Sequence, residues 1–201
     1  MTRFRKAVLS ILGVIGIVGA SCGAYAGLLQ YTGNFHPVID GQIYRSAQPS
    51  GADLAAYVQA HGIKTVINLR GSHPGSAWYD EEVKSSRELG LVHIDFGMSS
   101  ARLVSPAKAD RLVQLMENAP KPILIHCQAG ADRSGLASAL FVRKIAGLDE
   151  AKAEDQLSFY YGHVGIPVVS RAYAMDQSWE NIEAQDRQQA KADLSTGATV
   201  R

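Results

Sequence analysis

The sequence predicts an α/β fold, a three-layer sandwich with a central, mostly parallel sheet of about four or five strands and helices on both faces. Short β-branched or apolar runs alternate with longer helical patterns along the chain, which is typical of parallel sheets. The length of 201 residues suits one globular domain. A formal net charge of +1 gives no reason to expect nucleic-acid binding, which usually requires a basic face.

The first 29 residues are predicted to be a signal peptide or a single transmembrane anchor. Three basic residues among the first six precede a run from Ala7 to Leu29 that contains no charge. This run is long enough to span a bilayer, whereas Ala24-Tyr25-Ala26 fits a cleavage site before Gly27. Both alternatives place the domain outside the cytoplasm, as a periplasmic, secreted or membrane-anchored protein. Membrane association would run through residues 7–29.

The rest of the chain divides into a linker at 30–36, a main domain at 37–185 and a polar tail at 186–201, which is expected to fray from Ala190. The expected strands are 42–45, 64–69, 91–94 and 122–125. Between and after them, helices are expected at 52–61, up to Leu89, from Ser105-Pro106, at 134–145, after Asp149 and after Ser170. Ser50, Ser105, Asp149 and Ser170 are the expected N-caps.

The segment His126 to Gly135 carries the clearest chemistry. It follows an apolar strand and opens a helix, which is where open α/β sheets bind ligands. Its backbone N–H groups can converge on an anion and favour the thiolate of Cys127, the nucleophilic form of cysteine. Arg133 presents a planar set of donors that matches phosphate oxygens. The Ser134 hydroxyl can hydrogen-bond the thiolate and aid its departure. The expected phosphate-binding positions are Gln128, Ala129, Gly130, Ala131, Asp132 and Arg133.

The pattern His-Cys-x-x-Gly-x-x-Arg-Ser at residues 126–134 resembles the signature of the cysteine-based protein tyrosine phosphatases, especially their dual-specificity branch. The segments 44–49 (Tyr-Arg-Ser-Ala-Gln-Pro) and 66–70 (Val-Ile-Asn-Leu-Arg) resemble the opening of the atypical dual-specificity phosphatases of bacteria, fungi and plants. The resemblance covers roughly residues 35–161. It implies hydrolysis of a phosphate monoester through a phosphocysteine intermediate, with no metal or other cofactor.

A phosphatase of this kind needs a general acid for the leaving oxygen. The family places an Asp on a mobile loop before the cysteine, and Asp95 precedes Cys127 by 32 residues, which fits that distance. The alternative for Asp95 is that it caps a turn. Asp132 is the second candidate, because some similar inositide phosphatases carry an Asp directly before the arginine. The alternative for Asp132 is that it sets the shape of the loop.

The substrate is left open between two classes. A phosphorylated protein, carrying phosphotyrosine with phosphoserine or phosphothreonine, is the first expectation, and an inositol phosphate or phospholipid head group is the second. Export favours the second, but the loop Gln128 to Asp132 contains no lysine and one acid, which suits a singly phosphorylated ligand. Arg45 and Arg70 are either at the entrance or on the solvated surface.

Two other classes of protein compete with the phosphatase interpretation. One is a catalytically weak phosphate-binding module, against which the intact Cys127 and Arg133 count. The other is a sulfur-transfer or arsenate-reducing enzyme, against which the Gly130 and Ser134 positions count. No histidines and carboxylates stand at metal-ligand spacing, so no metal site is predicted.

Overall fold

The computed structural model describes residues 3–195, which form two compact units that meet between Thr32 and Gly33. The first unit is the helix α1 (Arg3–Tyr31) with Thr32. Its stretch Ala7–Tyr31 is long and apolar enough to cross a membrane, with a mean hydropathy of 2.1. The helix therefore extends beyond residue 29, into the range in which the sequence predicts a linker.

The second unit is built on a five-stranded sheet with the order β1-β2-β5-β3-β4. Only the β1–β2 pair is antiparallel, and the other three pairs are parallel. The strands are β1 (His36–Ile39), β2 (Ile43–Ser46), β3 (Thr65–Asn68), β4 (Val92–Asp95) and β5 (Ile123–His126). The α/β prediction is thus confirmed. The strand β1 was missed because it contains Pro37, which weakens a strand pattern and is tolerated at a sheet edge such as this one.

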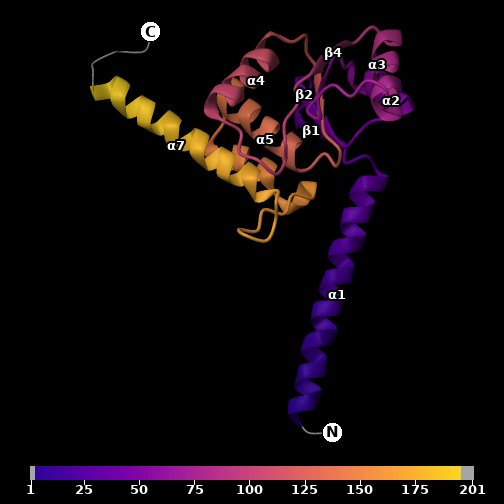
Figure 1. The fold of residues 1–201 in the computed structure, drawn as a ribbon, viewed down its shortest axis with the longest axis vertical. Helices are drawn as coiled ribbons and strands as arrows, with labels where there is room; N and C mark the ends of the chain where they lie inside the picture. Colours follow the sequence, from indigo (N-terminus) through magenta and orange to yellow (C-terminus); the bar gives the residue numbers. More distant parts are fainter. Residues whose placement is uncertain (1–2, 196–201) are drawn as a thin grey trace. The chain divides into compact units, whose positions relative to one another are not determined.

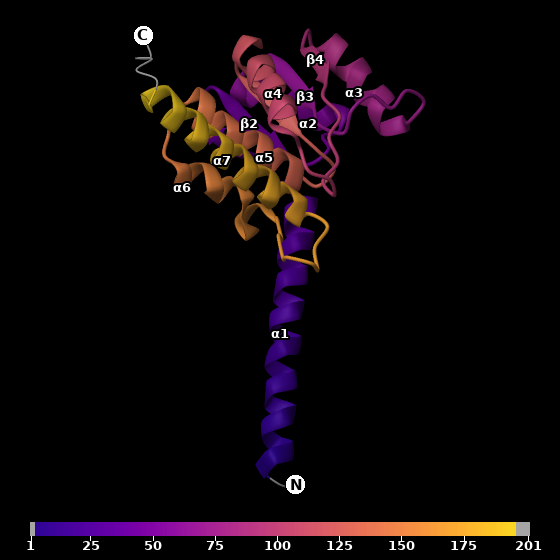
Figure 2. The same ribbon diagram turned by 60° about the vertical axis from the view of Figure 1, so that its left-hand side comes forward.

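Helices cover both faces of the sheet, as Figures 1 and 2 show. One face packs through Tyr44, Val66 and Leu124 against apolar residues of α2 (Gly51–His61) and the segment that ends α3. The other face carries the larger core, in which strand residues pack against three helices. The helices are α3 (Ala77–Glu88) on the first face, and α4 (Pro106–Asn118), α5 (Asp132–Leu140) and α7 (Tyr173–Ser195) on the second.

Several local signals predict helix starts correctly. The Ser50, Ser105 and Asp149 side chains each accept a backbone N–H from the first turn of α2, α4 and α6 (Glu150–Glu154). The region after the phosphate-binding loop differs from expectation, because α5 ends at Leu140 and a π-helical turn follows at Phe141–Ile145. Two short 3₁₀ turns, Asp155–Leu157 and Phe159–Tyr161, precede α7.

The last helix also continues further than the sequence suggests. It reaches Ser195, whereas the polar tail was expected from residue 186 and fraying from Ala190. Ion pairs to other elements hold this part, since Asp186 lies 3.0 Å from Lys144 and Arg187 lies 2.9 Å from Glu150. The remainder of the predicted tail, 196–201, lies outside the described residues.

Candidate active site

The predicted phosphate-binding loop curls between the end of β5 and the start of α5. Cys127 follows β5 directly and is only 2% exposed, and Asp132 and Arg133 are the first residues of α5. Gly130 has a φ of +70°, and a Cβ there would lie 2.6 Å from the backbone nitrogen of Ala47, so this position requires glycine. No side chain among the described residues caps α5, which leaves its first N–H groups available to an anion.

Two buried polar groups of this loop have no partner in the part of the chain that the structure describes. They are Arg133 Nε and the hydroxyl of Ser134. A buried donor without an acceptor costs free energy, and such groups are commonly found where a ligand binds. Arg133 makes one long contact, 3.4 Å from Nη1 to the carbonyl of Met98. The loop thus presents unpaired donors beside the buried thiol.

Arg45 lies beneath the loop and is fully buried, so its expected place at the entrance or on the surface is wrong. Its Nη2 donates to the carbonyls of Gly130 and Ala131, both at 2.9 Å, and Nη1 donates to the carbonyl of Gln156 at 2.8 Å. Burial lowers the pKa of Arg45 to about 10, although Tyr161 and Cys127 act in the opposite direction. The guanidinium therefore stays charged at neutral pH and fixes the loop carbonyls away from the anion site.

Asn34 makes a second brace for the loop. This residue is buried and its side-chain amide donates to the carbonyls of Ala129 and Tyr161, both at 2.9 Å. The ring nitrogen Nε2 of His36 lies 3.1 Å from the side-chain oxygen Oδ1 of Asn34. The sequence places Asn34 in a linker, and nothing in its neighbourhood signals this contact, because the partners lie 95 and 127 residues further along.

A buried carboxylate, Glu82 of α3, supports His126 next to the cysteine. The Glu82 Oε1 lies 3.1 Å from His126 Nε2 and 2.7 Å from His93 Nε2, and Oε2 accepts a hydrogen bond from Gln48. Burial raises the pKa of Glu82, but hydrogen bonds from His126 and His93 outweigh it and lower the pKa to about 2. Glu82 is therefore ionised at neutral pH and orients the histidine. Nothing in the sequence around Glu82 indicates this contact, since its histidine partners lie 11 and 44 residues further along.

Asp95 lies at the end of β4, two strands away from β5. The register aligns Asp95 with Asn68 and Asn68 with His126, which corresponds to a backbone separation of about 10 Å. One Asp95 oxygen accepts from Asn68 at 2.9 Å and the other accepts from the hydroxyl of Tyr79 at 2.5 Å. Both Asp95 oxygens thus have hydrogen-bond partners within the domain.

Asp132 is one of two carboxylates that hold the buried imidazole of His163 between them. His163 Nδ1 lies 2.8 Å from Asp132 Oδ1, and His163 Nε2 lies 2.9 Å from Asp176 Oδ2 of α7. Burial lowers the pKa of His163, but the hydrogen bonds to the two carboxylates raise it by more. The contact to Asp132 uses Oδ1 only. Neither His163 nor Asp176 was singled out from the sequence.

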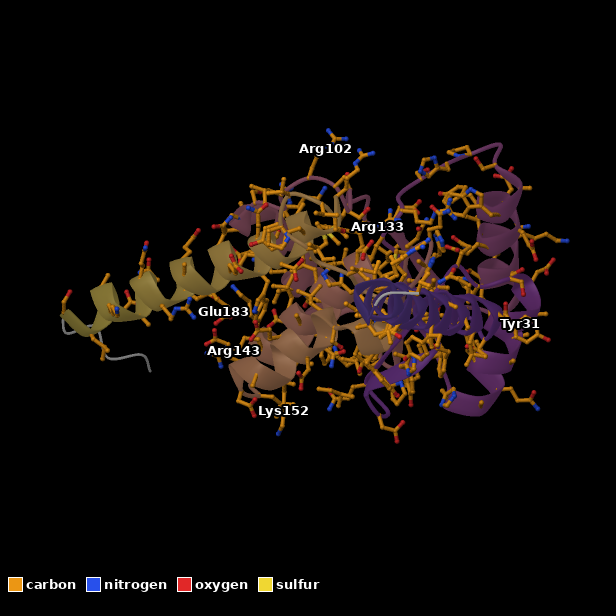
Figure 3. The ribbon with its side chains drawn as sticks, turned by 90° about the horizontal axis from the view of Figure 1, so that it is seen from below. Tyr31, Arg102, Arg133, Arg143, Lys152 and Glu183 are labelled. Atoms are coloured by element: carbon orange, nitrogen blue, oxygen red, sulfur yellow. The ribbon has the colours of Figure 1, made fainter. Side chains whose placement is uncertain are left out.

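A basic pocket of about 420 Å³ adjoins the loop. Three cations line it, Arg70, Arg102 and Lys108, and no carboxylate does. Met98 connects the two regions, because it lines the pocket and its carbonyl contacts Arg133. Burial and then the charge of Arg133 lower the pKa of Arg70, which is consistent with two neighbouring guanidinium groups. In Figure 3 Arg102 extends from the outer edge of the molecule, opposite to the edge that carries Lys152.

Arg70 is held in place at the rim of this pocket. Its Nη1 donates to Gln48 Oε1 at 2.8 Å, and its guanidinium lies 3.4 Å above the ring centroid of Trp78. Within residues 3–195, no group of three or more His, Cys, Asp or Glu side chains is arranged to hold a metal ion.

In this α/β sandwich, the loop that follows the central strand β5 carries a buried cysteine and an arginine. This arrangement defines a class of protein. A sequence model described as "Tyrosine phosphatase family" matches residues 26–157, which is more than half of the chain. The chain therefore belongs to the tyrosine phosphatase family. None of the curated protein sequences compared with this chain matches it.

Solved structures share this fold at low sequence identity. TpbA of P. aeruginosa is 20% identical with a TM-score of 0.52, and the alignment covers 76% of this chain and 92% of TpbA. The catalytic core of SIW14 from S. cerevisiae is 21% identical with a TM-score of 0.55, covering 77% and 93%. PTPMT1 is 14% identical with a TM-score of 0.55, covering 77% and 99%. At these identities the likeness establishes the fold.

Proposed function

We propose that this protein hydrolyses phosphate monoesters through a phosphocysteine intermediate on Cys127. The observation that supports this most is the loop itself, where a buried thiol lies beside two buried donors, Arg133 Nε and Ser134 Oγ, that have no partner among the described residues. A bound phosphate and a thiolate would satisfy both donors. Arg45 and Asn34 hold the loop carbonyls away, so the backbone N–H groups can face the anion.

The proposed reaction has two displacement steps at phosphorus. The Cys127 thiolate forms a bond to phosphorus while the bond to the leaving oxygen breaks, and that oxygen takes a proton from a general acid. Water then attacks the phosphocysteine and gives its proton to the same carboxylate, and the thiolate leaves. Arg133 stabilises the equatorial oxygens in both steps, and the Ser134 hydroxyl donates to the departing sulfur.

The arrangement favours Asp132 over Asp95 as the general acid. Asp132 belongs to the phosphate loop, and its hydrogen bond to His163 uses only one of its two carboxylate oxygens. Asp95 sits two strands away and both of its oxygens accept hydrogen bonds from Asn68 and Tyr79. Asp95 then serves to tie β4 to the neighbouring strand β3 and to helix α3.

Trapping of the intermediate tests the reaction directly. The full chain, purified in detergent, is mixed with an aryl phosphate and quenched in acid within the first turnover. We expect a phosphate adduct on the peptide that contains Cys127, together with steady release of phosphate. Turnover without any adduct would point to direct attack by water and would reject the proposal.

For the substrate, the basic pocket favours a phosphate ester that carries further negative charge, such as an inositol phosphate or an inositol phospholipid head group. The loop by itself lacks a lysine, but Arg70, Arg102 and Lys108 supply positive charge from outside it. The relatives differ in ligand: TpbA is described in complex with pTyr, PTPMT1 in complex with PI(5)P, and SIW14 as a PP-IP phosphatase. The pocket supports the inositol-type class for this chain.

Removal of pocket charges should change substrate preference. We expect Arg102→Ala and Lys108→Ala each to raise KM for an inositol polyphosphate by about 10-fold or more, since a charge-assisted hydrogen bond contributes about 1.5–3 kcal/mol. The kinetics with an aryl phosphate, which carries a single phosphate group and no further charged group, should change little. Lys152→Ala, which removes an exposed lysine at the opposite edge in Figure 3, is the matched control. An equal rise in KM for both substrates would show that the pocket does not recognise the additional charge of the substrate.

A further inference from the structure

A largely apolar segment, most of whose large side chains face outward, lies next to the phosphate-binding loop, and only its buried His163 contacts a residue of the proposed reaction. Residues 159–170 contain no Asp, Glu, Lys or Arg. Most of their large side chains are exposed, and Val168 is fully so. The exposed members are Phe159, Tyr160, Val164, Ile166, Val168 and Val169. Soluble proteins seldom expose a contiguous apolar segment of this kind without a partner for it.

The backbone of this segment presents valines outward at a conformational cost. The N–H groups of Val169 and Ser170 both donate to the carbonyl of Ile166, which closes a tight turn. Val168 in that turn has a φ of +67°, a region that β-branched residues rarely adopt. A polar residue or glycine would suit a solvated turn better, so the apolar side chains at its tip need a reason outside the folded domain.

Contacts within the domain connect this segment to the point where the N-terminal helix joins. Asn34 donates to the Tyr161 carbonyl at 2.9 Å, and the His36 ring lies 5.3 Å from the ring of Tyr160. Tyr31, the last residue of α1, is only three residues before Asn34, so covalent geometry limits their separation to about 11 Å. Asn34, three residues after the end of α1 along the chain, therefore lies at the base of the apolar segment.

We propose that the segment 159–170 docks on the lipid surface into which α1 inserts. The proposal takes α1 as a retained membrane span, as its length and hydropathy allow. Tyr31 would then lie at the membrane–water interface, where tyrosine is enriched, and Tyr160 would lie at the same level. Val164, Ile166, Val168 and Val169 would bury apolar surface between head groups, and Arg171, which follows the segment, would meet anionic lipid.

Docking would also hold the phosphate-binding loop close to the head groups. His163 joins the two regions, since it lies directly before Val164 and contacts Asp132 of the loop at 2.8 Å. Asn34 braces the same loop at Ala129. The surface proposed here goes beyond hydrolysis of the phosphate ester, and it can be tested in a protein that lacks the nucleophile.

The experiment measures how deep single positions lie in a bilayer. The full chain with Cys22→Ser and Cys127→Ser receives one new cysteine at Leu12, Val168 or Leu194, labelled with a polarity-sensitive fluorophore. Leu12 reports insertion of α1. Leu194 is a matched exposed apolar residue near the far end of α7, about 32 Å from Tyr173 along that helix. Each protein is reconstituted in phosphatidylcholine and phosphatidylglycerol vesicles with or without lipids that carry a nitroxide quencher.

We expect quenching at Leu12 and Val168 to be several-fold stronger than at Leu194, with a blue shift at Val168. Quenching at Leu12 without quenching at Val168 would overturn the docking proposal while retaining the anchor. A blue shift at Val168 that occurs only at high protein density, without quenching by the nitroxide lipids, would overturn the lipid proposal. It would show instead that the segment contacts a second copy of the protein. If neither Leu12 nor Val168 is quenched, α1 does not insert into the bilayer, and the docking proposal is overturned together with that premise. Aryl phosphate hydrolysis by the unlabelled natural chain is measured separately, so failure of docking is distinguishable from failure of the proposed reaction.

Discussion

Replacement of Cys127 by serine should lower kcat for an aryl phosphate by about 10⁴-fold or more, which is the scale of losing a catalytic nucleophile. A serine hydroxyl is not ionised at neutral pH and is a much weaker nucleophile than a cysteine sulfur. The change is nearly isosteric, and Cys127 makes no structural disulfide because the only other cysteine, Cys22, is also free. Phosphate or vanadate should therefore still bind, which calorimetry can measure.

The same assay separates the two candidate acids. We expect Asp132→Asn to reduce kcat about 10²-fold or more for an ester with a poor leaving group, which is typical of general acid catalysis, and much less for one with a very acidic leaving group. Asp95→Asn should cost less than Asp132→Asn on the poor leaving group. The reverse order would return the role to Asp95 and imply that its loop closes over Cys127.

Retained activity in Cys127→Ser would reject the covalent mechanism altogether.

Replacement of Arg45 by methionine should cause the largest loss of stability of any single change around the site. Methionine fills a similar volume but leaves the carbonyls of Gly130, Ala131 and Gln156 buried without a donor. We expect the free energy of unfolding to fall by about 3–5 kcal/mol, the range for removing one partner of a buried polar interaction. Turnover should fall as well, because the loop carbonyls are no longer held away from the phosphate.

Denaturant unfolding of the full chain in detergent measures this effect. Arg187→Met is the control, since Arg187 is exposed and its ion pair with Glu150 should contribute 1 kcal/mol or less. Arg45→Lys keeps a positive charge but loses the planar set of donors, so it should recover part of the stability and little of the activity. If Arg45→Met unfolds with the same free energy as Arg187→Met, the loop does not depend on this guanidinium.

Local sequence patterns determined much of the site and the framework around it. A β-branched or apolar run predicts each parallel strand, and the capping residues Ser50, Ser105 and Asp149 mark where helices begin, since these effects act within a few residues. The nucleophile, the loop and the arginine are likewise adjacent in sequence from Cys127 to Ser134. Their spacing alone was enough to predict an anion-binding loop, because loop geometry and helix start depend on neighbours along the chain.

Only the tertiary structure decided what surrounds that loop. Arg45 and Asn34 brace it from 85 and 95 residues away, and the partners of Glu82 and Asp132 come from other strands and helices. The basic pocket likewise combines Arg70 with Arg102 and Lys108, so the charge that a substrate meets differs from the charge of the loop alone. Such contacts depend on strand order and helix packing, which leave no periodicity or spacing in the sequence. The local sequence thus predicted the chemistry at Cys127. The tertiary structure decided which side chains support the loop that carries it.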